Sequence, residues 1–129
     1  MNKKLLKITE RGWAGHFCLA YNCQLRRNTL IQYGNIRVVV STLGLCRDKQ
    51  EGKFITIGID RYYETMVFKA ILIGNIYWDA DVTKQIDIKG KWRIGHYEFN
   101  ADKEANDMHK RIVEEIKERI KKGEFNNEI

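Results

Sequence analysis

The hydrophobic pattern changes abruptly near residue 101, and this change constrains the fold more than any other feature. From there to about residue 122, apolar residues recur at steps of three and four with charged residues between them: Ala105, Met108, Ile112, Val113, Ile116 and Ile120. Asn100 stands at the expected N-cap, and Lys121-Lys122-Gly123 supplies a basic, glycine-terminated end. The pattern predicts one long amphipathic helix over about 101–122, whose apolar face must be buried.

The sequence before this helix predicts a sheet over about 4–96. The segment 36–42 is dense in β-branched residues, and Gly34-Asn35 and Gly74-Asn75 are tight-turn signals. We therefore expect hairpins joining 29–33 to 36–42 and 62–72 to 76–78, a third hairpin joining 86–88 to 92–94, and short strands at 5–9, 16–20 and 54–57. With no linker or repeat, the 129 residues predict a single domain, 1–129. The predicted class is α+β, an antiparallel sheet covered by one long C-terminal helix.

Composition indicates a soluble globular protein, with 43% hydrophobic and 31% charged residues. No apolar run is long enough to cross a bilayer, and Lys7 interrupts the apolar start, so we expect neither a membrane span nor a secretion signal. The three cysteines are an odd number, and we expect Cys18, Cys23 and Cys46 to be reduced thiols in a cytoplasm.

The net charge of +6 favours an anionic partner. The basic residues are, however, interleaved with 17 acidic residues and form no arm or stripe. This distribution argues against DNA or RNA as the partner and leaves nucleotides and other small anions.

Residues 11–33 combine rings and arginines at a density that folding alone rarely requires: Arg11, Trp13, His16, Phe17, Tyr21, Arg26, Arg27 and Tyr33. Rings offer apolar faces to bases, and guanidinium groups offer planar donors to phosphates or carboxylates. The segment predicts a site for an anionic, ring-containing ligand. Arg26-Arg27-Asn28-Thr29 is interpreted as a loop before a strand. It suits a solvated basic turn and an anion clamp equally well.

The residue types for a metal or a nucleophile occur, but their spacing is unfavourable. His16, Cys18, Cys23 and Cys46 are zinc donor types without a C-x-x-C pair, so we expect no metal. A Cys–His nucleophile would need a third, orienting group, and the sequence indicates none. Common nucleotide-binding and hydrolase motifs do not occur, so the sequence predicts neither an enzyme nor a cofactor.

Two further polar clusters favour ordinary structural roles. Tyr62-Tyr63 should place one ring in the core and leave the other free to stack on a base or to pack at the rim. Asp79 and Asp81 lie two residues apart, and a polar turn after a strand explains them better than a carboxylate pair in a hydrolase.

The basic run His109-Lys110-Arg111 lies on the predicted helix. Arg111 stands beside the apolar face, with Asp107 and Glu115 four residues away on either side. Ion pairing along the helix explains Arg111 simply, although an arginine in this position can also reach an interface.

Several strings resemble a family of phage proteins. They are R-G-W-A-G-H-F, R-R-N-T-L-I-Q-Y-G, V-V-V-S-T, R-Y-Y-E-T-M and M-H-K-R-I-V-E-E-I, which together span about 8–121. The chain is similar in these strings to the first-described Thoeris anti-defence family, the phage "sponge" proteins.

This resemblance implies a non-enzymatic role in the cytoplasm of an infected bacterium. Members bind cyclic ADP-ribose isomers made by TIR-domain defence enzymes, and some hold cyclic di- or trinucleotides of CBASS systems at separate sites. The ligand is sequestered uncleaved, so the host effector stays inactive. The family implies a homo-oligomer, a hexamer built from dimers, in which arginines of neighbouring subunits meet the phosphates.

By motif, Arg111 and either Arg26 or Arg27 match these arginines, and Thr83 matches the cyclic-oligonucleotide site less closely. The expected ligand-binding residues are Arg111, Arg26, Arg27, Asn28, Trp13, His109 and Thr83. The alternatives are a nucleic-acid-binding module, a nucleotide-modifying enzyme using His16, Glu64 or Asp81, and a structural phage protein.

Overall fold

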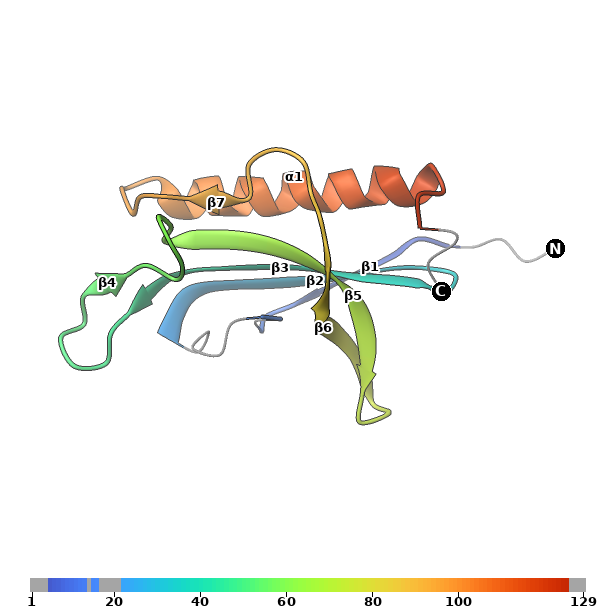
Figure 1. The fold of residues 1–129 in the computed structure, drawn as a ribbon, viewed down its shortest axis with the longest axis horizontal. Helices are drawn as coiled ribbons and strands as arrows, with labels where there is room; N and C mark the ends of the chain where they lie inside the picture. Colours follow the sequence, from blue (N-terminus) through green and yellow to red (C-terminus); the bar gives the residue numbers. More distant parts are fainter. Residues whose placement is uncertain (1–4, 14, 17–21, 126–129) are drawn as a thin grey trace.

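The fold combines an antiparallel sheet with one C-terminal helix, so the predicted α+β class is confirmed. The computed structural model describes residues 5–13, 15–16 and 22–125 (Figure 1). The elements in chain order are β1 (Lys7–Arg11), β2 (Cys23–Tyr33), β3 (Ile36–Arg47), β4 (Phe54–Ile55), β5 (Tyr63–Ile73), β6 (Tyr77–Ile86), β7 (Arg93–Ile94) and α1 (Ala101–Lys121).

The strands form a seven-stranded sheet with the central order β1-β2-β3-β5-β6, and every pairing is antiparallel. β4 pairs with β3, and β7 pairs with β5. The first two expected hairpins are confirmed. Gly74 and Asn75 both have positive φ, as a two-residue turn of the I′ type requires. The expected strand at 16–20 falls largely on residues outside those that the structure describes.

The helix α1 lies along one face of the sheet (Figure 1). All the predicted apolar positions of the helix are buried, and they pack against Val38, Val40 and Val67 of the central strands. Asn100 precedes the helix but its side chain makes no capping hydrogen bond. At the other end Gly123 has a φ of 79°, which lets the chain leave the helix as expected.

Three predictions of local structure are wrong. Arg26-Arg27-Asn28-Thr29 lies within β2 rather than in a loop, because β2 begins at Cys23. The carboxylates Asp79 and Asp81 lie within β6 rather than in a turn. The third hairpin does not form, because Ile86 and Ile94 pair with different parts of β5 rather than with each other.

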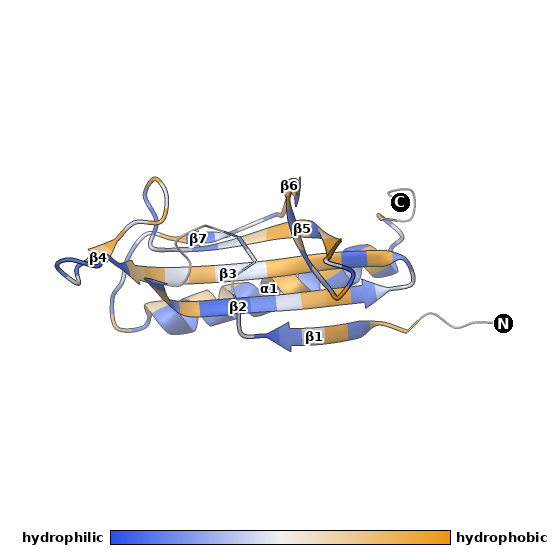
Figure 2. Ribbon diagram, turned by 90° about the horizontal axis from the view of Figure 1, so that it is seen from below, coloured by the Kyte–Doolittle hydropathy of each residue, from blue (hydrophilic) through white to orange (hydrophobic). Residues whose placement is uncertain are grey.

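The outer half of the β5–β6 hairpin, residues 70–80, which we call the outer hairpin, bends away from the rest of the sheet. The register shifts between Phe68, which pairs with Gln85, and Ala70, which pairs with Ala80. Figure 1 shows this outer half turning to the side opposite α1, and Figure 2 shows it crossing in front of the sheet on that side. A bulge of this kind bends a strand and breaks its ladder locally.

The expectation of reduced thiols is wrong for two of the three cysteines. Cys23 and Cys46 are directly opposite in the β2–β3 ladder and form a disulfide. Their separation of 23 residues gave no local signal, because only the hairpin register brings them together. Cys18 lies outside the described residues.

Candidate functional site

A cavity of about 270 Å³ lies where the bent hairpin leaves the sheet. β3 contributes Arg37, β5 contributes Lys69, and β6 contributes Trp78 and Lys84. Ile36 and Phe125 add apolar surface. We call this the cationic cavity, because its described lining holds three basic side chains and no carboxylate.

The guanidinium of Arg37 lies over the indole of Trp78, with the Cζ atom 4.2 Å from the ring centroid. Such stacking holds the guanidinium plane in a fixed orientation. The Nε atom of Arg37 is buried and has no hydrogen-bond partner among the described residues. A buried donor without an acceptor is costly, so an acceptor on a ligand would be favourable there.

The cavity offers two kinds of surface to a ligand. Arg37 and the two lysines can balance at least two negative charges, and a guanidinium binds a phosphate through parallel hydrogen bonds. Trp78 and Ile36 give the apolar surface that a base requires. The arrangement suits a phosphorylated, ring-containing molecule.

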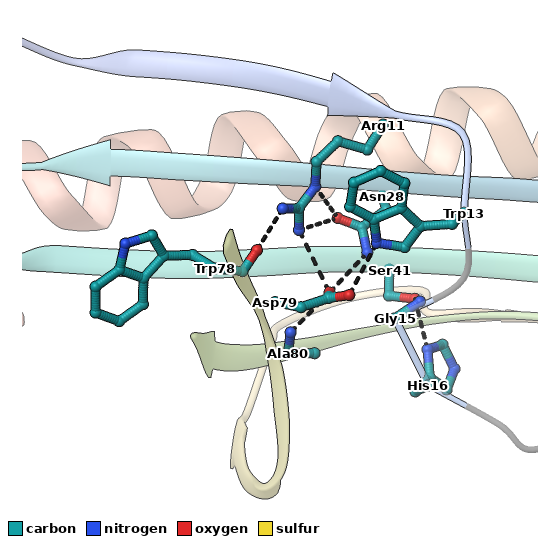
Figure 3. A network of polar contacts seen from close by, with 9 residues as sticks. All are labelled: Arg11, Trp13, Gly15, His16, Asn28, Ser41, Trp78, Asp79 and Ala80. Atoms are coloured by element: carbon teal, nitrogen blue, oxygen red, sulfur yellow. Dashed lines mark hydrogen bonds and ion pairs between the residues drawn. The ribbon is translucent and has the colours of Figure 1, made fainter. Parts of the chain in front are cut away.

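A polar network adjoins the cavity at Trp78, as Figure 3 shows. We call it the Asp79 network, and its four side chains are Arg11, Trp13, Asn28 and Asp79. Arg11 donates from Nε and Nη2 to Asn28 Oδ1, at 2.9 and 2.6 Å, and from Nη2 to Asp79 Oδ1 at 3.3 Å. Asn28 Nδ2 donates to Asp79 Oδ1 at 3.1 Å, and Trp13 Nε1 donates to Asp79 Oδ2 at 2.8 Å. Arg11 Nη1 also donates to the backbone carbonyl of Trp78.

The centre of this network is removed from solvent. Asn28 is fully buried, and the side chain of Arg11 is only 7% exposed. Burial lowers the pKa of the Arg11 guanidinium, and the neighbouring Asp79 carboxylate opposes that shift. The charges of Arg11 and Asp79 therefore compensate each other at a position with little water.

A second buried cluster lies around His16. His16 Nδ1 lies 2.7 Å from Ser41 Oγ, and His16 Nε2 lies 3.2 Å from Glu64 Oε2. Arg61 Nε donates to Glu64 Oε1 at 3.0 Å. Burial alone would raise the pKa of Glu64, but the hydrogen bonds from His16 and Arg61 outweigh it and lower that pKa.

The sequence prediction that His16 lacks an orienting group is therefore wrong, since Glu64 fills that position. Ser41, the hydroxyl next to His16, is fully buried and so is not placed as an accessible nucleophile. Its Oγ accepts a hydrogen bond from the backbone N–H of Gly15 at 3.1 Å. The cluster fastens Gly15 and His16 to the sheet. Cys18, the other member of the expected nucleophile pair, is not among the described residues.

The structure brings two of the expected ligand-binding residues, Trp13 and Asn28, together in the Asp79 network. Arg26 is exposed on the face of the sheet opposite α1. Thr83 is exposed on β6, where its hydroxyl donates to Asp81 at 2.6 Å. Neither Arg26 nor Thr83 lines the cationic cavity.

Two other expected residues, Arg27 and His109, lie on the helix side of the sheet and line a small cavity of about 110 Å³. Arg27 pairs with Glu10 at 3.0 Å and donates to Asn106 at 3.3 Å. His109 is fully buried, and both ring nitrogens contact threonine hydroxyls, Thr29 at 2.7 Å and Thr42 at 2.6 Å. In this conformation the His109 ring offers a ligand no free nitrogen.

Arg111 lies apart from both groups. It donates to the backbone carbonyls of Lys89 and Lys91 and lies 3.9 Å from Glu115. The expected pairing with Glu115 is thus present, whereas Asp107 pairs with Lys103 instead. Arg111 consequently holds the loop between β6 and β7 against the helix.

Sequence reasoning missed the residues of the cationic cavity. Arg37 stands at the start of a β-branched strand, Trp78 was expected at the end of the strand 76–78 without a binding role, and Lys84 was left unassigned. The one local signal of this cavity is Arg37, a lone arginine in a hydrophobic strand. It does not reveal the bend of the β5–β6 hairpin, which completes the cavity.

No protein-family model matches the chain, and comparisons with curated proteins and with solved structures find no significant match. Within the described part of the chain, α1 lacks the length of apolar sequence that a membrane-crossing helix needs.

Proposed function

We propose that this protein binds an anionic signalling nucleotide and sequesters it without chemical change, as its resemblance to the phage sponge proteins implies. The observation that supports the proposal is the cationic cavity, in which Arg37 stacks on Trp78 beside two lysines. Cyclic ADP-ribose isomers are the proposed ligands, with cyclic di- or trinucleotides of CBASS as further candidates. The proposed place of action is the cytoplasm of an infected bacterium.

The size of the cavity supports a ligand of nucleotide dimensions. Its volume of about 270 Å³ lies just below the range for small-molecule sites, about 300–1,000 Å³, which fits part of a nucleotide-sized ligand. We propose that it receives one phosphorylated nucleotide unit, with the phosphates on Arg37 and Lys84 and the base against Trp78. A cyclic trinucleotide would extend beyond it.

The chemistry of the lining supports binding rather than conversion. Among the described lining residues, Asn35, the basic side chains and the indole offer hydrogen bonds, charge and stacking. They include no carboxylate, imidazole, hydroxyl or thiol, and we assign the two lysine amines to charge pairing with the phosphates rather than to catalysis. A sponge requires this combination, because a ligand that was turned over would not remain bound.

We also propose a homo-oligomer with a second kind of site between subunits. Arg27 and Arg111 lie on opposite flanks of α1 and contact different segments of the chain. A single ligand that used both types of arginine would therefore have to take them from two copies. The hexamer built from dimers is the assembly that the family resemblance implies.

The experiment is calorimetric titration with cyclic ADP-ribose isomers and cyclic trinucleotides, followed by heat denaturation and analysis of the released ligand. Tight binding with intact ligand supports the sponge, whereas recovery of a cleaved product would identify an enzyme. Arg37→Gln and Lys84→Gln should each weaken binding about tenfold or more. Lys53→Gln, an exposed lysine next to β4 at the opposite end of β3 from Arg37, is the control for loss of one charge.

Absence of binding by the wild-type protein to every nucleotide tested would reject the proposal. Binding to single-stranded or duplex nucleic acid with a steep salt dependence would instead support the nucleic-acid-binding alternative.

A further inference from the structure

We propose that the Asp79 network is a clasp that holds the outer β5–β6 hairpin against β1 and β2 and thereby sets the position of Trp78 in the cationic cavity. This inference rests on the proposed binding function. Arg11, Asn28 and Asp79 would then control ligand affinity without touching the ligand, and we call them positioning residues.

The first argument concerns how weakly the sheet itself holds the outer hairpin. Between the pairs Phe68–Gln85 and Ala70–Ala80 the register shifts, so residues 81–84 of β6 have no regular partner on β5. A ladder interrupted in this way transmits little rigidity from the inner to the outer half. The angle of the outer hairpin must therefore be fixed by other contacts.

The second argument is that apolar burial supplies those contacts only in part. Ile71, Leu72 and Ile73 on β5 are about 40% exposed, and Ile76 in the turn is 83% exposed. The three strand residues are therefore only partly removed from water, and Ile76 hardly at all, so apolar burial holds the outer hairpin incompletely. An aromatic contact between the outer hairpin and the rest of the chain is made to the network itself, by Tyr77 against Trp13, with ring centroids 5.9 Å apart.

The third argument is the convergence of polar contacts on two consecutive residues of β6, as Figure 3 shows. The Trp78 carbonyl accepts from Arg11, and the Asp79 carboxylate accepts from Arg11, Asn28 and Trp13. The Asp79 Oδ1 atom also accepts the backbone N–H of Ala80 at 2.8 Å. These contacts connect β1, β2 and Trp13 to the hairpin close to the bulge.

The fourth argument is that Trp78 belongs to both structures. Its backbone carbonyl is held by Arg11, while its ring lies over Arg37 and lines the cationic cavity. Any rotation of the outer hairpin would move this ring and the Arg37 guanidinium stacked on it. The clasp therefore determines the shape of the cavity through the position of Trp78.

The test uses Asp79→Asn, which keeps the size of the side chain but replaces one acceptor oxygen by a donor. At least one donor of Arg11, Asn28 or Trp13 then loses its acceptor. Asp81→Asn is the matched control, because it makes the same change of charge two residues away, at a carboxylate that contacts Thr83 and not the clasp. We expect Asp79→Asn to bind cyclic ADP-ribose about tenfold more weakly and Asp81→Asn to bind like the wild type.

A spectroscopic readout separates positioning from general stability. The protein is labelled with 5-fluorotryptophan, and the Trp78 fluorine resonance is assigned with Trp78→Phe. We expect that resonance to shift or broaden in Asp79→Asn and to remain in place in Asp81→Asn. If Asp79→Asn does not fold, Trp13→Phe serves in its place, because it removes the hydrogen bond to Asp79 and reduces the ring contacts with Arg11 and Tyr77.

The outcomes distinguish the clasp from the function on which it rests. If the wild type binds but Asp79→Asn has unchanged affinity, the clasp is wrong and the proposed function stands. If the wild type binds neither cyclic ADP-ribose isomers nor cyclic di- or trinucleotides, the proposed function fails, and the Trp78 resonance decides the clasp alone. An unshifted Trp78 resonance in Asp79→Asn would then overturn the positioning role.

Discussion

The imidazole of His109 on α1 is hydrogen-bonded through Nε2 to the hydroxyl of Thr29 on β2, at 2.7 Å. Thr29 donates its own proton to Glu10, also at 2.7 Å, so Nε2 must be the protonated nitrogen. Nδ1 therefore accepts from Thr42, which in turn accepts from Thr65. A directed chain of hydrogen bonds thus crosses the interface between helix and sheet and ends at the Glu10 carboxylate.

This chain predicts that His109→Leu destabilises the fold even though it adds an apolar side chain to a buried site. The hydroxyls of Thr29 and Thr42 would lose their imidazole partner in a place without water, at a cost of about 2–4 kcal/mol in the free energy of unfolding. Urea denaturation followed by circular dichroism measures the change. His109→Gln, which retains polar atoms, should be less harmful, and equal stability of His109→Leu and wild type would contradict the role.

The burial of His109 also predicts a dependence of stability on pH. Burial first, and then the charge of Arg27, lower the pKa of this imidazole from 6.5 to about 3. The unfolded chain is therefore protonated at His109 below about pH 6.5, while the folded chain stays neutral down to about pH 3. In this window the unfolded state binds more protons, and acidification removes up to about 1.4 kcal/mol of stability per pH unit.

The measurement is the free energy of unfolding of wild type and His109→Gln at pH 7, 5.5 and 4.5. Carboxylates that titrate in both proteins cancel in the difference between the two curves. We expect the wild-type curve to fall more steeply on acidification than the His109→Gln curve. Parallel curves would show that His109 does not carry this proton linkage.

A close approach between β3 and β5 predicts that Gly44→Ala is strongly destabilising. A Cβ atom at Gly44 would lie 2.0 Å from the Cδ2 atom of Tyr63, whose ring is fully buried. Relieving that overlap requires movement of a packed aromatic ring, and we expect a loss of about 1–3 kcal/mol or more. Gly12→Ala is the control, since a Cβ atom there meets no heavy atom within 4 Å. A thermal melt compares the two variants.

The hydroxyl of Tyr63 gives a milder prediction. It donates to the carboxylate of Asp102 in the first turn of α1, and burial, together with this hydrogen bond, raises the pKa of Tyr63. Tyr63→Phe keeps the ring but leaves the helix start without this contact, so we expect a loss of about 1–2 kcal/mol. Chemical denaturation measures it, and a double-mutant cycle with Asp102→Ala tests whether the loss belongs to this pair.

The Cys23–Cys46 disulfide closes a loop with a sequence separation of 23 residues. Such a crosslink restricts the unfolded chain, and its removal should cost about 2–4 kcal/mol. We expect Cys23→Ser/Cys46→Ser to melt at a lower temperature than the oxidised wild type and to be insensitive to reductant. An identical melting temperature with and without reductant in the wild type would contradict a stabilising disulfide.

The pattern of apolar residues was sufficient to predict the helix and two of the hairpins. Steps of three and four from Ala105 to Ile120 permit only a helix with one buried face, and the structure buries every one of these residues. Gly34-Asn35 and Gly74-Asn75 predicted two turns, in which Gly34, Gly74 and Asn75 have the positive φ that few residues tolerate. These signals are local, so they predict structure without knowledge of the tertiary contacts.

The candidate site was only partly predictable. Trp13 and Asn28 were expected at a binding site, and the structure places them in the network beside the cationic cavity. Arg37, Trp78 and Asp79 were missed, because their roles depend on a hairpin that bends at a bulge. A bulge has no strong sequence signature, and no short sequence motif reveals which residues pair with partners far apart in the chain.

The sequence alone thus determined the α+β class, the position of the helix and the excess of basic charge, since periodicity and charge are properties of the chain itself. Tertiary structure alone decided that His109 is buried in a polar chain, that Cys23 meets Cys46, and that Arg37 and Trp78 share a cavity. Each of these relationships depends on strand register and on the bend of a hairpin. Both are settled by long-range packing, which no local pattern of residues encodes.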